Sequence, residues 1–309
     1  MKIGYFADGQ WAHRAIELMI ESNDIEIVFI VPRFDTQDPV LKAYAKQLNI
    51  PFLLMEDVNS ESSLSELAKY SCDIFVSMSF NQIIRRELIN LSPKGFINCH
   101  AGALPFYRGR NPLNWVLIND EKEFGITVHY IDEGIDTGDI IERDLYPITD
   151  NDDYSTLLSR AIDQCGRLLL KALLSIKQGK ANRVPQSMIN SVGSYFFQRK
   201  EGDEFIDFNW SSRRVFNFVR ALSRPGPLAR FRYKGNVYLV ESASILIDAP
   251  AFEGNEGQVI DISDSNIVVK VSDKVIKLLL SVDQPLLSKE APRLIRGQFL
   301  NDHDKKAQK

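Results

Sequence analysis

Strand patterns and helical patterns alternate along the first hundred residues of this chain. Apolar runs typical of buried strands occur at MKIGYFA, IEIVFIVP, PFLLM and DIFVSMSF. Between and after them lie helical patterns that end at Ile20, cover Pro39 to Leu48, and follow as IIRRELINL. Such alternation predicts a mainly parallel α/β sheet of the Rossmann-like kind. Ligands of these sheets bind beyond the carboxyl ends of the strands, which we expect after Ala7, Phe80 and His100.

The second half of the chain has a different pattern. Apolar residues at helical spacing predict one long helix from Tyr154 to Lys180 that packs on the sheet. A polar crossing follows, and from Ala229 onward five short strand patterns predict a small open barrel: ARFRYKG, NVYLVESASIL, GQVIDIS, NIVVKVS and KVIKLLLSV. We therefore expect an N-terminal domain over residues 1–190 and a β-rich domain over residues 191–309.

Composition narrows the function classes. With 309 residues and 44% hydrophobic residues the chain is long enough for two cores, and its net charge of -4 gives no basic field for nucleic acid. The three cysteines lie far apart without metal-ligand spacing, so we expect core thiols and no metal. No signal peptide or membrane span is visible, which predicts a cytoplasmic protein. The first strand lacks G-x-G-x-x-G, so nicotinamide dinucleotide binding is not supported.

The segment GFINCHAGALP carries the first chemical signal. It predicts a strand from Gly95 to Cys99 that ends in a Gly/Pro-rich loop, and residues two apart in a strand share a face. Asn98 and His100 should therefore point the same way, with Cys99 opposite. An amide beside an imidazole suits oxyanion stabilisation together with proton transfer.

A lone histidine is more often structural, but the later segment HYIDEGIDTGDI strengthens the case. It places four carboxylates among glycines that permit close approach of the backbone to a ligand: Asp132, Glu133, Asp136 and Asp139. A carboxylate that reaches His100 would raise the pKa of the imidazole and fix its tautomer. For Glu133 and Asp139 a solvated turn is favoured, and His129 in the same segment is interpreted as structural.

These motifs resemble the N10-formyltetrahydrofolate-dependent formyltransferases. The resemblance rests on Asn98-x-His100, Leu104-Pro105, Arg108-Gly109, Pro112 and Gly134–Gly138 in the family's order and spacing. It implies a catalytic trio of Asn98, His100 and Asp136 and an OB-like C-terminal domain. Asn98 would donate to the oxyanion, His100 would accept the amine proton, and Asp136 would hold His100 and help protonate N10 of the folate. The proton route between His100 and Asp136 stays open.

The resemblance also implies where the cofactor N10-formyltetrahydrofolate binds. Its pterin should enter the crevice between SFNQIIRRELI and HYIDEGIDTGDI, between apolar side chains and backbone groups. The implied contacts are Phe80, Gln82, Ile83, Ile84, Asp132, Gly134 and Ile135.

The acceptor amine divides the family between initiator methionyl-tRNA and nucleotide-linked amino sugars. The tRNA enzymes carry a long basic insertion after the second strand, whereas the stretch PRFDTQDPVLKAYAKQ is short and of mixed charge. LPFYRGRNPLNW also resembles the sugar enzymes, which favours a dideoxy amino sugar, most simply dTDP-linked, for O-antigen or another surface glycan. The expected substrate contacts are Tyr107, Arg108, Gly109, Arg110, Asn111 and Trp115, with Arg199 and above all Arg220 for the diphosphate.

Several alternatives stay open. Formylation of methionyl-tRNA is the first, and a formyltetrahydrofolate hydrolase or a catalytically silent sugar-nucleotide binder are others. The intact trio argues against a silent binder. The sequence does not decide between dTDP, UDP and GDP, between an amine at C3 and at C4, the stereochemistry of the sugar, or whether the protein is a homodimer.

Overall fold

The computed structural model describes residues 1–282 and 293–300, and these form two compact units. The N-terminal unit comprises Met1–Pro112, Glu123–Pro147 and Leu158–Phe197. The C-terminal unit comprises Leu113–Lys122, Ile148–Leu157 and the chain from Gln198 onward. The last crossing between the units therefore follows Phe197, and the boundary expected between residues 190 and 191 stays a prediction.

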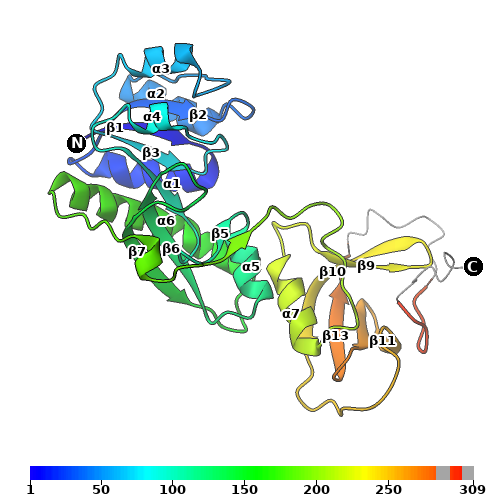
Figure 1. Cartoon of the computed structure of the whole chain (residues 1–309). Helices are drawn as coiled ribbons and strands as arrows, with labels where there is room; N and C mark the ends of the chain where they lie inside the picture. The colour runs from blue at the N-terminus through cyan, green and yellow to red at the C-terminus, as the bar shows by residue number, and fades with distance from the viewer. Residues whose placement is uncertain (283–292, 301–309) are drawn as a thin grey trace, which may run out of the picture. The chain divides into compact units, whose positions relative to one another are not determined.

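A six-stranded sheet forms the centre of the N-terminal unit, in the order β2-β1-β3-β4-β6-β7 (Figure 1). The first four strands of this order are parallel, and β6 and β7 run antiparallel to their neighbours. This arrangement confirms the predicted mainly parallel α/β sheet. The strand bounds are β1 Lys2–Ala7, β2 Glu26–Pro32, β3 Ile74–Met78, β4 Phe96–His100, β6 Glu123–Tyr130 and β7 Ile140–Pro147.

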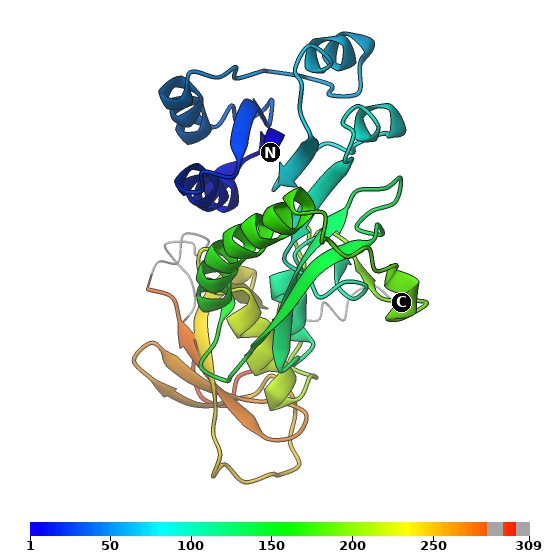
Figure 2. The same ribbon diagram turned by 90° about the vertical axis from the view of Figure 1, so that its left-hand side faces the viewer.

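Two helices that pack closely against each other cover one face of this sheet. Helix α1 (Gly9–Glu21) meets the long helix α6 (Tyr154–Lys177) where a Cβ added to Gly166 would lie 3.3 Å from the Ala15 Cα. Figure 2 shows α1 and α6 on the same side of the strands. Helix α2 (Pro39–Leu48) begins with a proline, and its Asp38 cap accepts from Val40 and Leu41 backbone N–H groups.

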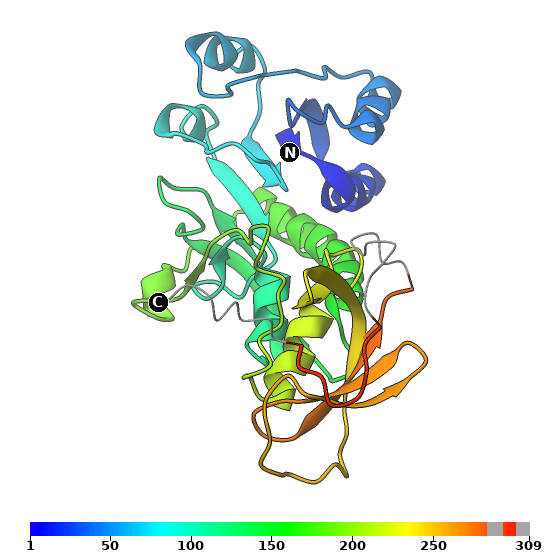
Figure 3. The same cartoon turned by 90° about the vertical axis from the view of Figure 1, so that its right-hand side faces the viewer.

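Aromatic side chains fill the opposite face of the sheet. Phe6 lies with its ring centroid 4.9 to 5.8 Å from those of Phe29, Phe75 and Phe96. These rings are buried beneath α3 (Glu61–Leu67) and α4 (Arg86–Ile89), which contribute Leu67 and Leu88 to the same core. Figure 3 shows α3 and α4 across the strands from α1. The sheet is thus covered on both faces, as a parallel sheet requires.

The C-terminal unit contains a five-stranded antiparallel sheet in the order β11-β12-β13-β10-β9. All five predicted strands are present, as β9 Ala229–Tyr233, β10 Asn236–Ile245, β11 Val259–Ser263, β12 Asn266–Lys270 and β13 Val275–Leu280. Helix α7 (Ser212–Ala221) packs its buried Val215, Phe218 and Val219 on this sheet's core. We did not predict this helix from the sequence.

Other elements differ locally from prediction. The strand expected at PFLLM is a single bridge between Ile30 and Phe52, and Pro51, which has no N–H, cannot extend that ladder toward residue 50. The helix expected over IIRRELINL is only α4, and the long helix ends at Lys177, before Gly179 at φ +67°. The remaining elements are β5 Arg108–Gly109, α5 Pro112–Ile118, the 3-10 turn Gln186–Met188 and β8 Tyr195–Phe196.

Two further observations concern the described residues as a whole. Cys72, Cys99 and Cys165 are buried free thiols. Across residues 1–282 and 293–300, no helix combines the length and the apolarity that crossing a bilayer requires.

Candidate active site

The carboxyl end of β4 presents Asn98 and His100 on one face. The other face carries Cys99, whose thiol points to the Cys165 carbonyl in α6 at 3.6 Å. Within β4 only Asn98 is partly exposed, while its four neighbours are buried. The strand therefore delivers an amide to the surface beside a buried imidazole, as its alternation predicts.

Asp136 lies against this face of β4. Its Oδ2 is 3.6 Å from His100 Nδ1, and the Gly109 N–H donates to the same oxygen at 2.9 Å. The residue adopts φ 55°, a left-handed conformation that Asp and Asn tolerate better than most side chains. The segment expected to bring a carboxylate to His100 thus does so through Asp136.

The charge state of Asp136 follows from its surroundings. Burial of the carboxyl disfavours its ionised form, but the nearby His100 imidazole and the Gly109 N–H favour it. The balance holds the pKa of Asp136 well below its usual range. The site therefore contains a buried, ionised carboxylate at neutral pH.

Both ring nitrogens of His100 face oxygen atoms. Nε2 lies 2.7 Å from the Tyr107 carbonyl, which can only accept, so Nε2 carries a proton. Nδ1 faces the Asp136 carboxylate. With Nε2 donating to the Tyr107 carbonyl, Nδ1 is the ring nitrogen left toward Asp136.

His129 belongs to this cluster, although we interpreted it as structural from the sequence. It lies directly opposite Asn98 in the β4–β6 register, with Asn98 Nδ2 3.3 Å from its Nε2. Its Nε2 is also 3.5 Å from Asp136 Oδ1, and its side chain is 2% exposed. The alternation within ITVHYID indicates which residues share a face of that strand. It does not indicate that His129 lies opposite Asn98, which depends on the β4–β6 register.

Gln186 is a second residue that sequence reasoning missed. Its side-chain N–H groups donate to the backbone carbonyls of Asp136 at 2.8 Å and Gly138 at 2.9 Å. Its oxygen accepts from the Arg108 guanidinium at 3.0 and 2.7 Å. Through these bonds the buried Gln186 links the segment that carries Asp136 to the loop after β4, which carries Arg108.

The predicted substrate loop is held by a two-residue strand pair between β5 and β8. The Tyr107 ring stacks on Phe196 with centroids 5.0 Å apart, and the Arg110 N–H donates to the Phe196 carbonyl. At Gly109 (φ +93°) any Cβ would lie 2.2 Å from that carbonyl oxygen, so only glycine fits. Arg110 and Asn111 follow as exposed residues.

Three predicted substrate residues fall in the C-terminal unit. The Arg199 guanidinium lies 5.7 Å from the Trp115 ring centroid and 5.5 Å from that of Phe218. Arg220 is 6% exposed and donates to Asn217 Oδ1 and to the carbonyls of Thr149 and Asp152. These contacts use donors of the Arg220 guanidinium inside its own unit, and its role toward a diphosphate stays a prediction.

The predicted pterin contacts lie on two neighbouring segments of the N-terminal unit. Ile83 and Ile135 expose large apolar side chains, and an ion pair of 3.5 Å between Arg86 and Glu133 joins the two segments. Asp132 Oδ1 accepts from the Gly134 N–H and from the Thr137 hydroxyl, which shapes the second segment. On the first segment Ile84 is buried, Phe80 packs on Phe6, and Gln82 bonds to Val58 and Met55.

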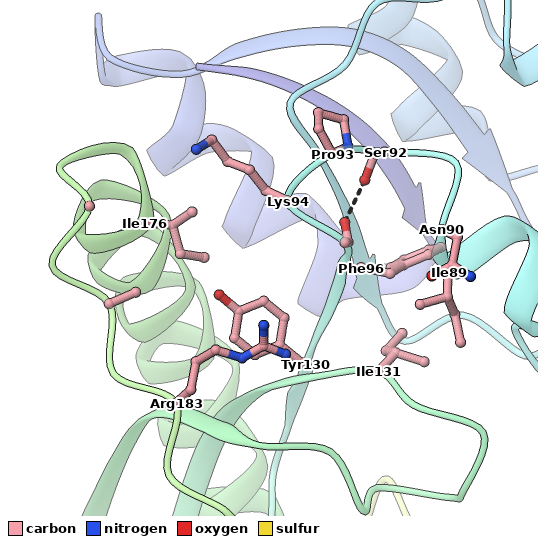
Figure 4. Close-up of a pocket in the computed structure, with 13 residues that line it drawn as sticks. Ile89, Asn90, Ser92, Pro93, Lys94, Phe96, Tyr130, Ile131, Ile176 and Arg183 are labelled. Atoms are coloured by element: carbon pink, nitrogen blue, oxygen red, sulfur yellow. Dashed lines mark hydrogen bonds between the residues drawn. The ribbon is translucent and has the colours of Figure 1, made fainter.

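A cavity of about 560 Å³ opens near the beginning of β4, away from Asn98 and His100 (Figure 4). Phe96, Tyr130, Ile131 and Ile176 contribute to its lining, and the Arg183 guanidinium lies 4.0 Å from the Tyr130 ring centroid. None of the seven predicted pterin contacts lines it. This cavity is therefore distinct from the predicted cofactor residues.

Fold and site together define a class of α/β enzyme with an amide, an imidazole and an ionised carboxylate at a strand's carboxyl end. A model described as formyl transferase matches residues 1–173, and one described as formyl transferase C-terminal domain matches residues 199–285. The chain belongs to the formyl transferase family, and it is a formyltransferase.

Proteins that resemble this chain include both a methionyl-tRNA formyltransferase and sugar N-formyltransferases. The chain is 32% identical to a methionyl-tRNA formyltransferase of Pelotomaculum thermopropionicum over 277 residues, which is 87% of each protein. A solved sugar 3N-formyltransferase, WlaRD, aligns with a TM-score of 0.69 and 22% identity, covering 92% of this chain and 98% of that one. An N-formyltransferase of Helicobacter canadensis aligns at 0.68 and 19%, covering 91% and 100%. Both structural likenesses describe the fold.

Proposed function

We propose that this protein transfers the formyl group of N10-formyltetrahydrofolate to the amino group of a nucleotide-linked dideoxy amino sugar. The observation that carries the choice of acceptor is the connection between β2 and α2, which spans only residues 33–38. The proposed product is a building block of O-antigen or another surface glycan, made in the cytoplasm.

The proposed chemistry uses each member of the cluster. The sugar amine attacks the formyl carbon, and Asn98 donates a hydrogen bond to the oxygen that becomes negative. The new N–C bond forms, the amine loses a proton, and the bond from carbon to N10 breaks as N10 gains a proton. The His100–Asp136 pair, with Nδ1 3.6 Å from Oδ2, relays the proton from the amine toward N10 in this proposal.

The short β2–α2 connection supports a small acceptor because it is tied to the body of the N-terminal unit. Arg33 donates to the Ser79 carbonyl at 2.8 Å, Thr36 bonds to Asp8, and Asp38 accepts from the Gly9 N–H at 2.8 Å. The tRNA enzymes are expected to carry a long basic insertion at this place. A tied six-residue loop offers no such arm for RNA phosphates.

Ligands of two solved neighbours support an acceptor and a donor of these kinds. WlaRD was solved in the presence of dTDP and 5-N-formyl-THF. The Helicobacter canadensis protein was solved in complex with folinic acid and dTDP-3-aminofucose. For this chain we carry over a folate and a nucleotide sugar as the proposed ligands.

Methionyl-tRNA is the second candidate acceptor, because a methionyl-tRNA formyltransferase is 32% identical over 87% of the chain. This identity exceeds that of the two sugar enzymes. The identity is distributed over the whole aligned fold and therefore does not report on the acceptor. The β2–α2 connection, in contrast, bears directly on RNA binding. We therefore rank the sugar first and test both acceptors together.

The test is an end-point assay with N10-formyltetrahydrofolate and a panel of dTDP-, UDP- and GDP-linked amino sugars. Charged initiator tRNA is included in parallel, and products are read by mass. We expect a gain of one formyl group on at least one sugar. Formylated methionyl-tRNA without any formylated sugar would contradict the proposal, and formate with neither product would indicate a hydrolase.

The panel also determines what the sequence leaves open. Sugars with the amine at C3 and at C4 are offered on each nucleotide, so the preferred position and nucleotide appear as ratios of kcat/KM. A matched control uses His100→Ala, for which turnover should fall by orders of magnitude while circular dichroism stays that of the folded protein. Normal turnover in this variant would remove His100 from the mechanism.

A further inference from the structure

Asn98 and His129 face each other as a cross-strand pair in the register of β4 and β6. We propose that His129 is a positioning residue that holds the Asn98 amide with one N–H directed to the reacting formyl oxygen. This inference rests on the proposed formyl transfer at Asn98. It adds to that function a residue that touches neither substrate.

The tautomer of His129 follows from its backbone partner. Nδ1 lies 2.8 Å from the Tyr130 carbonyl, and a carbonyl oxygen can only accept a hydrogen bond. Nδ1 therefore carries a proton. In a neutral ring, Nε2 is then left with a lone pair and acts as an acceptor.

The proposed role requires a neutral His129 ring, because the Asn98 NH₂ group can donate to Nε2 only if that nitrogen carries no proton. Within residues 1–282 and 293–300, the Asp136 carboxylate is the one negative group that lies against both rings, with Oδ2 toward His100 and Oδ1 toward His129. Each ring has a backbone carbonyl at one nitrogen and an Asp136 oxygen at the other, so the two imidazoles share a single carboxylate. A second buried cation at His129, 2% exposed, would leave an uncompensated charge in the site.

A neutral His129 acceptor selects one orientation of the Asn98 side chain. The amide must turn its NH₂ edge, and not its oxygen, toward the lone pair on Nε2, and Nδ2 lies 3.3 Å away. One N–H is used by His129, which leaves the second for the partly exposed side of β4. There it is available to an oxyanion.

The local backbone supports this placement. The β6–β7 pairing shifts register between Val128 and His129, and such irregularities commonly direct a side chain next to an active site. The neighbouring Thr127 accepts from the Leu104 N–H and donates to the Gly102 carbonyl, which ties the same strand to the loop after His100. Strand β6 therefore supports both catalytic side chains of β4.

The tautomer can be measured without any substrate. The chain has four histidines, so long-range ¹⁵N–¹H spectra of histidine-labelled full-length protein can be assigned with single His→Gln variants. At neutral pH we expect His129 to carry its proton on Nδ1 with a bare Nε2. A ring protonated on Nε2, alone or with Nδ1, would overturn the inference whatever the acceptor sugar is.

Kinetics then test the role. His129→Leu should lower kcat by about 10² to 10³, the cost of losing one oxyanion donor, with KM for the folate changed less than about threefold. His129→Gln places an amide oxygen near the position of Nε2 and should recover kcat to within about tenfold of wild type. A Gln variant as slow as the Leu variant would contradict the acceptor role.

A double-mutant cycle separates action through Asn98 from a general packing effect. In an Asn98→Ala background, His129→Leu should lower kcat by less than about threefold further, because the group that it positions is gone. If the double variant lowers kcat by the product of the two single-variant factors, His129 acts on a group other than Asn98. If wild-type protein formylates no amine, the proposed function fails, while the NMR result still decides the tautomer.

Discussion

Two buried or half-buried aspartates, one in each unit, have lowered pKa values for different reasons. In the N-terminal unit Asp136 faces His100, His129 and a backbone N–H. In the C-terminal unit Asp120 bonds to the Arg213 guanidinium, at 2.9 Å from Nε, and to Lys122 at 3.1 Å. Burial opposes ionisation of Asp120, but these cations hold its pKa at about 2.

The difference between them lies in the partners. Arginine keeps its proton at all ordinary pH values, so Asp120 has a fixed cation and cannot exchange a proton with it. Histidine gives up and takes up protons near neutral pH, so Asp136 has a partner with which a proton can move. A lowered carboxyl pKa alone therefore does not identify a catalytic group, whereas the titration of its partner does.

The largest expected effect comes from removing the charge of Asp136. Asp136→Asn should lower kcat by about 10³ to 10⁴, the size of the loss when the carboxylate beside the catalytic histidine of a serine protease becomes an amide, because the charge facing His100 Nδ1 is removed. Steady-state kinetics with the acceptor found in the panel measures this. The matched control is Asp120→Asn, for which kcat should stay within about threefold of wild type, and equal losses in both variants would remove the contrast.

Arg220 should matter for stability and little for chemistry. Arg220→Met leaves the carbonyls of Thr149 and Asp152 without their donor and should lower the free energy of unfolding by about 3 kcal/mol. Urea unfolding followed by tryptophan fluorescence reports it, since Trp115 and Trp210 belong to the C-terminal unit. A stable variant with a raised KM for the nucleotide sugar would instead support Arg220 as a diphosphate ligand.

Gln186 should have an intermediate effect on turnover. Gln186→Met removes the bonds to the Asp136 and Gly138 carbonyls and to Arg108, so kcat should fall by roughly 10- to 100-fold, about 1.4 to 2.7 kcal/mol. Gln186→Glu keeps the bond to Arg108 but replaces the donor to both carbonyls. A Glu variant with the wild-type kcat would show that the bond from Gln186 to the Asp136 carbonyl does not contribute to turnover.

The smallest expected effect is the pH dependence of stability from Asp120. Its folded pKa is lowered, so the stability that its ionised form contributes is complete above pH ~5 and is lost as the pH falls from ~4 toward 2. The difference in unfolding free energy between wild type and Asp120→Asn should therefore shrink between pH 5 and pH 3. A difference that grows on acidification would contradict the assignment.

Local periodicity predicted what depends on neighbouring residues. The alternation of β4 is enough to place Asn98 and His100 together, and five short strand patterns are enough to predict β9 to β13. The approach of Asp136 to His100 was implied by the family resemblance, because no local rule brings residues 36 positions apart together.

The residues that were missed depend on contacts across the chain. His129 needed the β4–β6 register, and Gln186 reaches the Asp136 carbonyl across 50 positions of sequence. Arg220 was assigned to the diphosphate because guanidinium groups match phosphate oxygens and because FVRALSRPGPLA resembles the family's interdomain motif. Its burial against the carbonyls of Thr149 and Asp152, 71 and 68 positions away, is invisible in the sequence.

The left-handed backbone at Asp136, φ 55°, limits which substitutions the protein can accept at this position during evolution. Asparagine is the other residue that readily occupies such a conformation, and each aspartate codon becomes an asparagine codon by one transition at its first base. That change would leave the fold intact while removing the carboxylate. A duplicated copy of this gene is thus one nucleotide away from encoding a folded protein with strongly reduced turnover, and codon 136 is the place to look for one.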